Sequence, residues 1–267
     1  MNIHLRHIGQ SILNTLFPRY CCVCGRRLLE SEQDLCLNCL FELPMTNLHG
    51  KKGSTFERIL WDDAVYTQHA NSMLYYRSKS NYCRIYFMFK YHNRPEIAVN
   101  FGRMMAQELQ GTDFFEGIDC MVPVPLSPQR MKQRGYNQSE RLAYGISLIT
   151  GIPIDTTSVI RNVDNPTQTH MSISERRRNV QGIFELANAE ALQNKHVLIV
   201  DDVITTGSTT RACARAVLKA EGTKISIISL GTSQFNKEKP KPFWIRPYSL
   251  HYKLKWFSAL LCVEPCF

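Results

Sequence analysis

The feature that most constrains the fold is the stretch VLIVDDVITTGST, which runs from Val197 to Thr209. Its leading apolar residues, largely β-branched, predict a strand buried on both faces, as in a parallel sheet. Asp201 and Asp202 follow that run directly, so we expect both carboxylates at the carboxyl end of the strand. Ligands of open α/β sheets bind at this edge. A helix is then predicted from about Ser208 to Glu221.

A turn rich in hydroxyl groups separates the two acids from that helix. It consists of Thr205, Thr206, Gly207, Ser208 and Thr209. Backbone N–H groups, hydroxyls and the positive end of a helix dipole at such a turn suit a phosphate group. The carboxylates would repel a phosphate, so their expected partners are neutral hydroxyls, such as those of a ribose, or a metal ion carried by the ligand. The pattern therefore predicts a sugar-phosphate site; the alternative is a capped helix after an incidental acid pair.

The rest of the 267-residue chain extends this prediction. Apolar strand-like runs alternate with helical patterns, which favours an α/β fold with a parallel sheet and helices on both faces. Strands are predicted at 118–124, 195–200 and 224–230, and helices at 95–110, 138–150 and 208–221. We expect three regions: a short helix and paired cysteines in 1–45, the α/β domain in 60–231, and a basic, aromatic tail in 232–267.

Two cysteine pairs near the N-terminus have metal-ligand spacing. Cys21 and Cys24 form one CxxC knuckle, and Cys36 and Cys39 form the second after eleven intervening residues. Four thiolates that face one ion make a closed tetrahedral site, so a structural Zn²⁺ is predicted. Free thiols in a small apolar patch and an iron–sulfur cluster are the alternatives. Cys22 is expected to be a spare. Core packing is the expected role of Cys83, Cys120, Cys213, Cys262 and Cys266.

The stretch at 197–209 resembles, throughout its length, the motif with which type I phosphoribosyltransferases bind 5-phosphoribosyl-1-pyrophosphate (PRPP). Further segments narrow the resemblance to the ComF family, whose members are associated with natural competence and DNA uptake. These segments, in chain order, are the cysteine pairs, FKYHNRPEIA at 89–98, VPVPLSPQRMKQRGYNQSERLA at 122–143, NPTQTHMSISERRRNVQGIF at 165–184 and the PRPP motif. The similarity covers about residues 20–231, and it implies a type I phosphoribosyltransferase fold with an N-terminal zinc-ribbon-like module.

The resemblance also implies roles for individual residues. Asp201 and Asp202 would face the ribose hydroxyls, residues 205–209 would hold the 5′-phosphate, and Mg²⁺ would accompany PRPP. A pyrophosphate loop would be formed by Val124, Pro125, Leu126, Arg130 and Arg134, and a flexible loop by Thr167, Gln168, Arg176 and Asn179. Asn93 stands where the family commonly has glycine, and asparagine tolerates the left-handed conformation. His92 and His170 are expected to be ordinary surface residues.

Charge and hydropathy bear on the partners. The formal net charge is +9, which favours phosphate-rich partners such as nucleotides or single-stranded DNA. Six basic and two acidic residues lie in 236–267 among several aromatics. No apolar run is long enough to span a bilayer, and a cytoplasmic location is expected. Two functions remain open: transfer of phosphoribose from PRPP to an unidentified acceptor, or a non-catalytic PRPP sensor or single-stranded-DNA-binding factor that acts with the competence machinery.

Overall fold

A computed structural model describes residues 18–48, 54–161 and 182–233. The chain divides into two compact units. Within the described residues, the first unit comprises 18–45 and 77–86, and the second comprises 46–48, 54–76, 87–161 and 182–233. The sequence-based predictions for the N-terminal helix, for the flexible loop and for the tail from residue 234 fall outside the described residues.

The second unit is built on a parallel sheet of four strands in the order β1-β6-β5-β2. The strands are β1 (Ala70–Tyr75), β2 (Cys120–Pro123), β5 (His196–Ile204) and β6 (Lys224–Thr232). Three of them correspond to predicted strands. β1 was missed because the polar Asn71 and Ser72 interrupt its sequence, ANSMLY, although all six of its residues are buried.

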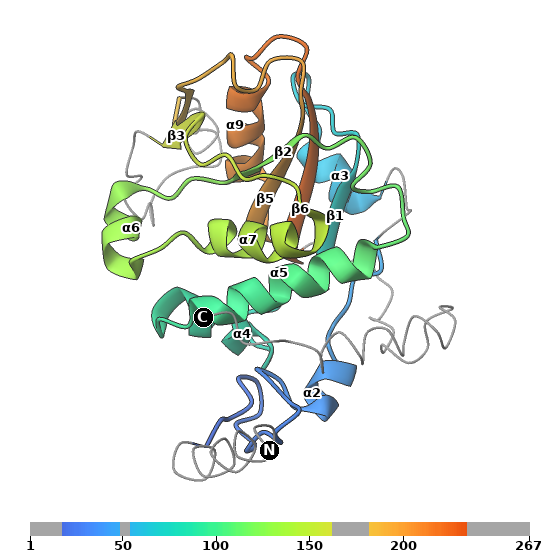
Figure 1. Cartoon of the computed structure of the whole chain (residues 1–267), viewed down its shortest axis with the longest axis vertical. Coiled ribbons are helices and arrows are strands. Elements are labelled where there is room, and N and C mark those ends of the chain that lie inside the picture. The colour runs from blue at the N-terminus through green and yellow to red at the C-terminus, as the bar shows by residue number, and fades with distance from the viewer. Residues whose placement is uncertain (1–17, 49–53, 162–181, 234–267) are drawn as a thin grey trace, which may run out of the picture. The chain divides into compact units, whose positions relative to one another are not determined.

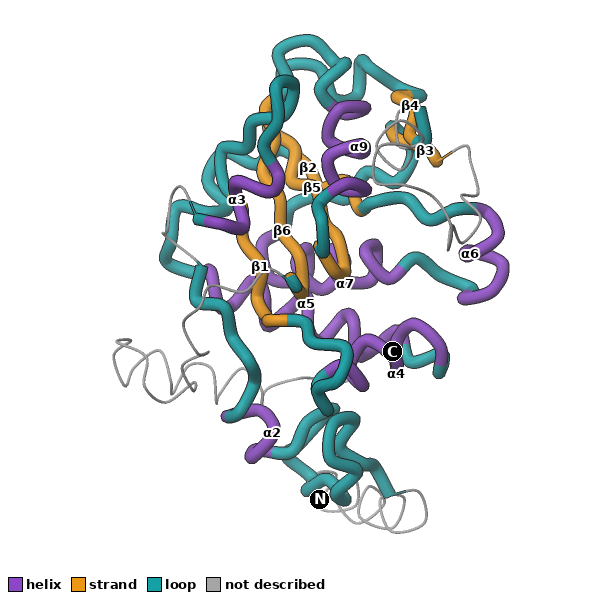
Figure 2. Tube along the Cα trace, turned by 180° about the vertical axis from the view of Figure 1, so that it is seen from behind, coloured by secondary structure: helices purple, strands orange, loops and turns teal. Residues whose placement is uncertain are grey.

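Helices cover the two faces of this sheet (Figures 1 and 2). α5 (Pro95–Leu109) and α7 (Gln138–Thr150) pack against each other on one face, and α3 (Thr55–Leu60) and α9 (Ser208–Val217) lie on the other. Gly102 and Gly145 let α5 and α7 come into backbone contact: a Cβ on Gly102 would lie 2.1 Å from the Leu142 carbonyl oxygen. Strand alternation divides β5 between the faces, so Val197 and Ile199 share a core cluster with α9 residues.

Shorter elements complete the described chain. They are α2 (Leu37–Phe41), α4 (Cys83–Tyr91), α6 (Pro128–Arg134) and the antiparallel pair β3 (Val159–Arg161) and β4 (Phe184–Leu186). The helix predicted at 208–221 ends earlier, at Val217, and the chain turns through residues 218–222 before it enters β6. Asn93 follows α4 and adopts a φ of 50°, the left-handed conformation expected there. No helix in the described ranges combines the length and the apolar character needed to cross a membrane.

Candidate functional site

The four predicted metal ligands come together in the first unit. The sulfur atoms of Cys21, Cys24, Cys36 and Cys39 all lie within 4.8 Å of one another, and the Cys24 and Cys36 sulfurs are 3.7 Å apart. A tetrahedron with metal–sulfur bonds of about 2.3 Å has sulfur–sulfur edges of about 3.8 Å. The cluster therefore has the dimensions of a tetrathiolate site. Cys22 is buried but is not a member of it, which agrees with the assignment of Cys22 as a spare.

The surroundings of the cluster favour bound metal. A hydrogen bond from the Arg26 backbone lowers the pKa of the Cys24 thiol to about 7, while burial raises the pKa of Cys36 and Cys39. Buried thiols are neutral in the absence of a cation, and a metal ion displaces their protons. The group can thus hold a soft divalent ion such as zinc, with no side left open for a substrate.

Glu32 holds the loop between the two knuckles. Its carboxylate, only 3% exposed, accepts hydrogen bonds from the backbone N–H groups of Leu29 and Leu37, at 2.7 and 2.8 Å, and pairs with Arg26 at 2.7 Å. Burial alone would raise the pKa of Glu32, but these donors together lower it. Sequence analysis missed this residue, since an acid between two cysteine pairs carries no distinctive pattern.

In the second unit, the acid pair lies where the sheet loses one of its strands. Pairing of β5 with β2 ends at Val200 and Pro123, followed by a hydrogen bond from the Val124 N–H to the Val200 carbonyl at 2.9 Å. Pairing with β6 continues as far as Ile204. The prediction that the acids follow the strand is therefore corrected: they lie inside β5, because β6 extends the strand on one side only.

Strand alternation sends the two carboxylates to opposite faces of the sheet. Asp201, 8% exposed, points toward α9, where it accepts a 2.8 Å hydrogen bond from the Thr210 hydroxyl. It also accepts one from the Asp202 N–H. Burial and the neighbouring charge of Asp202 raise the pKa of Asp201 to about 7. Asp202 instead pairs with Lys90 of α4, with 2.7 Å between Nζ and Oδ2.

The hydroxyl turn leads directly into α9. Gly207 is the N-cap residue of the helix and has a φ of 73°, a conformation that side chains disfavour. The hydroxyls of Thr206 and Ser208 are 3.0 Å apart. The first N–H groups of an α-helix lack partners within the helix, so the turn presents donors beside the carboxylates.

The predicted pyrophosphate loop follows β2 and is fixed from both ends. Ser127 caps α6 by accepting a hydrogen bond from the Arg130 N–H. The buried Asn137 caps α7 and donates to the Val124 carbonyl at 3.0 Å. The loop is therefore tied to the helix that covers the sheet, and Arg130 and Arg134 extend from the adjoining α6.

One pocket of about 300 Å³ joins the acid pair to this loop. Of the residues that sequence analysis singled out, its lining contains Val124, Pro125, Leu126, Arg130, Arg134, Asp201, Asp202, Thr205 and Thr209. The other lining residues are Tyr76, Lys90, Ser139, Arg161 and Val203. Thr206, Gly207 and Ser208 do not line it, and neither does the exposed His92. Thr167, Gln168, Arg176 and Asn179, together with His170, lie outside the described residues.

Four basic and two acidic side chains thus line the same pocket. The basic ones are Lys90, Arg130, Arg134 and Arg161. Such a lining suits a ligand that combines several phosphate charges with neutral hydroxyls. The additional basic residues, Lys90 and Arg161, come from α4 and β3, and only the fold brings them beside β5.

Comparisons with known proteins identify the family. Residues 132–257 match the phosphoribosyl transferase domain, a match that runs beyond residue 231, where the sequence-based domain ended. The chain is 30% identical over 207 residues to the DNA utilization protein YhgH of Escherichia coli K12. The aligned residues cover 74% of this chain and 84% of that protein. It is 29% identical to the Competence protein F of Haemophilus influenzae over 80% of this chain and 84% of that protein. The chain belongs to the ComF family.

The match to the Salmonella typhi YhgH protein is shorter: 35% identity over 49% of this chain and 58% of that protein, so the chain spans less than two thirds of that relative. Among solved structures, the ComF-family chain resembles the glutamine PRPP amidotransferase of B. subtilis, with 23% identity, a TM-score of 0.35 and coverage of 53% and 30%. It also resembles the adenine phosphoribosyltransferase of Thermoanaerobacter pseudethanolicus, with 17% sequence identity and a TM-score of 0.32. That match covers 51% of this chain and 81% of the other.

The predicted fold class is confirmed. The family match assigns a phosphoribosyltransferase domain, and the described strands form a parallel sheet covered by helices. The tetracysteine cluster supplies the expected N-terminal module of this ComF-family chain.

Proposed function

We propose that the pocket binds PRPP together with Mg²⁺. The observation that carries this proposal is the single pocket in which an acid pair, a hydroxyl turn and a basic loop meet. Asp201 and Asp202 accept hydrogen bonds from the ribose hydroxyls, and Thr205 and Thr209 contact the 5′-phosphate. The loop after β2, with Arg130 and Arg134, faces the pyrophosphate. The flexible-loop residues named from the sequence at 165–184 stay a proposed part of the site.

Lys90 has a specific part in this proposal. Its ammonium group pairs with the Asp202 carboxylate, at 2.7 Å. Without that pairing, the negative charge of Asp202 would stand uncompensated next to the buried carboxyl group of Asp201. A ribose hydroxyl or a Mg²⁺ carried by PRPP supplies the compensation instead, which frees the ammonium group to face a phosphate oxygen.

The proposed reaction is transfer of phosphoribose from PRPP to an acceptor, with release of pyrophosphate. Mg²⁺ would supply charge neutralisation of the departing pyrophosphate. The residues of this chain would hold the sugar by its hydroxyls, fix the phosphates by donors, and orient the ribose toward the acceptor. We further propose that the tetracysteine cluster holds a structural Zn²⁺, and that the protein works in the cytoplasm, where thiols stay reduced.

A second function is favoured by the names of the relatives. YhgH is called a DNA utilization protein, and the Haemophilus influenzae and Bacillus subtilis proteins are called competence proteins. Together with the net charge of +9, these names support a role in the handling of incoming single-stranded DNA, with PRPP as a sensed ligand and the competence machinery as partner.

Calorimetry tests the PRPP site. We expect Asp201→Ala combined with Asp202→Ala to weaken PRPP binding in Mg²⁺ by about 2–4 kcal/mol, because charge-assisted hydrogen bonds are lost at two positions. Asp113→Ala, at an exposed carboxylate in the same unit, is the matched control and should leave the affinity unchanged. Equal affinities for the double variant and the control would contradict the proposal.

Two assays separate the functions. A transferase releases pyrophosphate from PRPP when the acceptor is added. A DNA-handling protein binds a labelled oligonucleotide, and its affinity should fall by a factor on the order of 10² to 10³ between about 50 and 200 mM salt, for about five phosphate contacts. A salt-independent affinity, or a strong preference for one base sequence, would argue against distributed electrostatic binding.

A further inference from the structure

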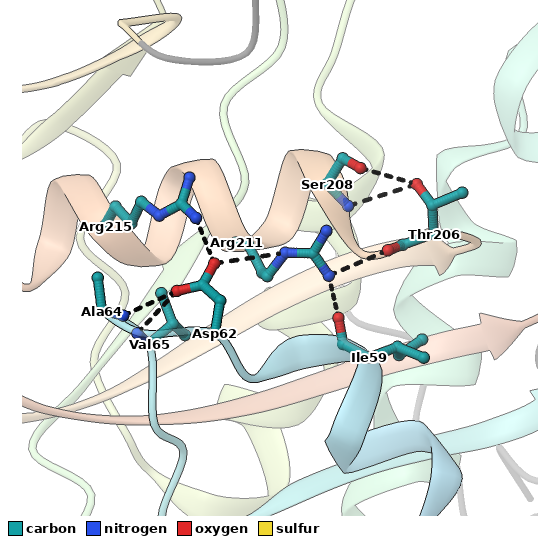
Figure 3. Close-up of polar contacts among 8 residues, drawn as sticks. All are labelled: Ile59, Asp62, Ala64, Val65, Thr206, Ser208, Arg211 and Arg215. Carbon is teal, nitrogen blue, oxygen red and sulfur yellow. Dashed lines mark hydrogen bonds and ion pairs between the residues drawn. The ribbon is translucent and has the colours of Figure 1, made fainter. Parts of the chain in front are cut away.

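Arg211 of α9 is hydrogen-bonded to the backbone of the hydroxyl turn. Its guanidinium donates hydrogen bonds to the backbone carbonyl oxygens of Thr206, at 3.2 Å, and of Ile59 at the end of α3 (Figure 3). These carbonyls belong to segments far apart in the sequence. One side chain therefore ties the turn at the start of α9 to the helix beside it.

Asp62 holds Arg211 in place. One oxygen of its carboxylate accepts hydrogen bonds from the N–H groups of Ala64 and Val65, each at 3.0 Å. The other oxygen lies 3.6 Å from Nε of Arg211 and also pairs with Arg215, one helical turn further along α9. Figure 3 shows the carboxylate between the two guanidinium groups. The two arginines share a partner, but only Arg211 reaches the carbonyl of the turn.

Gly207 packs directly against this cluster. A Cβ at this position would lie 2.8 Å from the Ile59 carbonyl oxygen and 3.1 Å from Nη1 of Arg211. The turn is therefore tightly packed against the Arg211 guanidinium and the Ile59 carbonyl. A displaced guanidinium would displace the backbone of the turn.

Planarity of the peptide bond links this contact to the ligand side. The Thr206 carbonyl and the Gly207 N–H belong to one trans peptide and point in opposite directions. With the carbonyl held by Arg211, the N–H points away from the cluster. If the peptide rotated, a carbonyl oxygen would take the place of a donor and would repel an anion bound at the turn.

We propose that Arg211 is a positioning residue for the 5′-phosphate: it fixes the Thr206–Gly207 peptide, and with it the turn between Thr205 and Thr209, the two residues of the turn that line the pocket. Asp62 orients Arg211 for this task. This inference rests on the proposed function, since it assumes that the turn receives a phosphate. Arg211 acts through the backbone and does not touch the ligand.

The test compares Arg211→Gln with Arg215→Gln. Both variants remove one positive charge from the same helix and one partner from Asp62, so they are matched in charge, and only the first loses the carbonyl contacts. Calorimetry in Mg²⁺ measures two probes, ribose 5-phosphate and pyrophosphate. We expect Arg211→Gln to weaken ribose 5-phosphate about tenfold and to leave pyrophosphate within about twofold, and Arg215→Gln to leave both within about twofold.

Two outcomes of this comparison would decide against the inference. Equal weakening of ribose 5-phosphate by both variants would show a charge effect alone. Loss of both probes in Arg211→Gln would show a general role in the scaffold, because retained pyrophosphate binding is the internal check of folding. Asp62→Asn, which keeps both arginines, should weaken ribose 5-phosphate selectively as well, and an unchanged affinity would remove Asp62 from the proposal. A wild-type protein that binds neither probe would instead overturn the proposed function and this inference with it.

Discussion

Glu32 in the cysteine unit and Asp201 in the sheet unit are both buried carboxylates, yet their pKa values shift in opposite directions. Glu32 has two backbone N–H donors and a guanidinium around it, which outweigh the cost of burial. Asp201 has one hydroxyl and one N–H, and a second carboxylate adjoins it. The donors around Glu32 thus lower its pKa, whereas burial and the charge of Asp202 outweigh the donors and the Lys90 charge that act on Asp201.

Under the proposed function, this difference separates a structural acid, Glu32, from a ligand-binding one, Asp201. A carboxylate that serves the fold is surrounded by donors that the fold supplies. A carboxylate that serves a ligand keeps an energetic deficit until the ligand arrives, and perturbed pKa values gather at functional sites for this reason. We therefore expect the Glu32 carboxylate to stabilise the cysteine unit and the Asp201 carboxylate to destabilise the sheet unit.

The largest expected effect comes from removal of the metal from the cysteine unit. Cys36→Ser should lower bound zinc from about one equivalent per chain to less than about 0.2, with loss of on the order of 10 kcal/mol of metal-dependent stabilisation. Cys22→Ser is the matched control, because Cys22 is buried beside the cluster but outside it. Elemental analysis measures the metal, and hydrogen exchange over 18–45 measures the folding. Full zinc occupancy in Cys36→Ser would break the assignment of the site.

A smaller effect is expected from Glu32→Gln. An amide cannot satisfy both backbone donors and leaves Arg26 without its buried partner, so the unit should lose about 3 kcal/mol. Hydrogen exchange of the Leu29 and Leu37 amides in zinc-saturated protein measures this loss. Glu30→Gln, at an exposed neighbouring position, should stay within about 0.5 kcal/mol of the wild type. Equal protection in the two variants would mean that Glu32 is no more structural than Glu30.

The smallest effect should have the opposite sign. Since the folded pKa of Asp201 is raised to about 7, its contribution to stability is full below its unfolded pKa of about 3.9 and is lost as the pH rises through 7. Asp201→Asn should therefore stabilise the sheet unit by about 2 kcal/mol at pH 8 and by little at pH 4, while PRPP binding weakens. Denaturant unfolding at both pH values, with Asp113→Asn as control, measures the gain. A variant less stable than the wild type at pH 8 would remove the contrast with Glu32.

Glu32 differs in its pH dependence as well. Its folded pKa is lowered, so its contribution is present above its unfolded pKa and is lost only as the pH falls through the folded value. The protection factor of the Leu29 amide, which is corrected for the pH dependence of intrinsic exchange, should therefore fall in acid and stay constant between neutral and mildly alkaline pH. The same range of pH is where the contribution of Asp201 is lost.

The sequence was most informative where the chemistry is local. Asp201, Asp202 and the four clustered cysteines are each defined by short spacings, and their arrangement follows from strand alternation and from the geometry of a CxxC knuckle. Lys90 was missed although its segment was noticed, because its partner Asp202 becomes a neighbour only when α4 reaches the end of β5. Arg161 and Tyr76 line the pocket for the same kind of reason.

Strand boundaries and the contacts that support the site could not be predicted, because they depend on residues far away in the sequence. The length of β5 is set by β6, which continues to Thr232, and periodicity within β5 carries no information about its neighbour. Asp62 and Arg211 meet through tertiary packing of α3 against α9, and neither lies in a recognisable motif. Glu32 likewise acquires its role only when three donors from the folded loop surround it.

The contact between Gly102 and Gly145 has a consequence for how this family can diversify. Because α5 and α7 touch through their backbones, α7 is held close to α5, and its cap residue Asn137 ties the start of α7 to the Val124 carbonyl. The exposed Met131, Lys132 and Gln133 of α6 line no part of the pocket, unlike Arg130 and Arg134 of the same helix. Substitutions at these three positions should therefore leave the proposed sugar site unaltered.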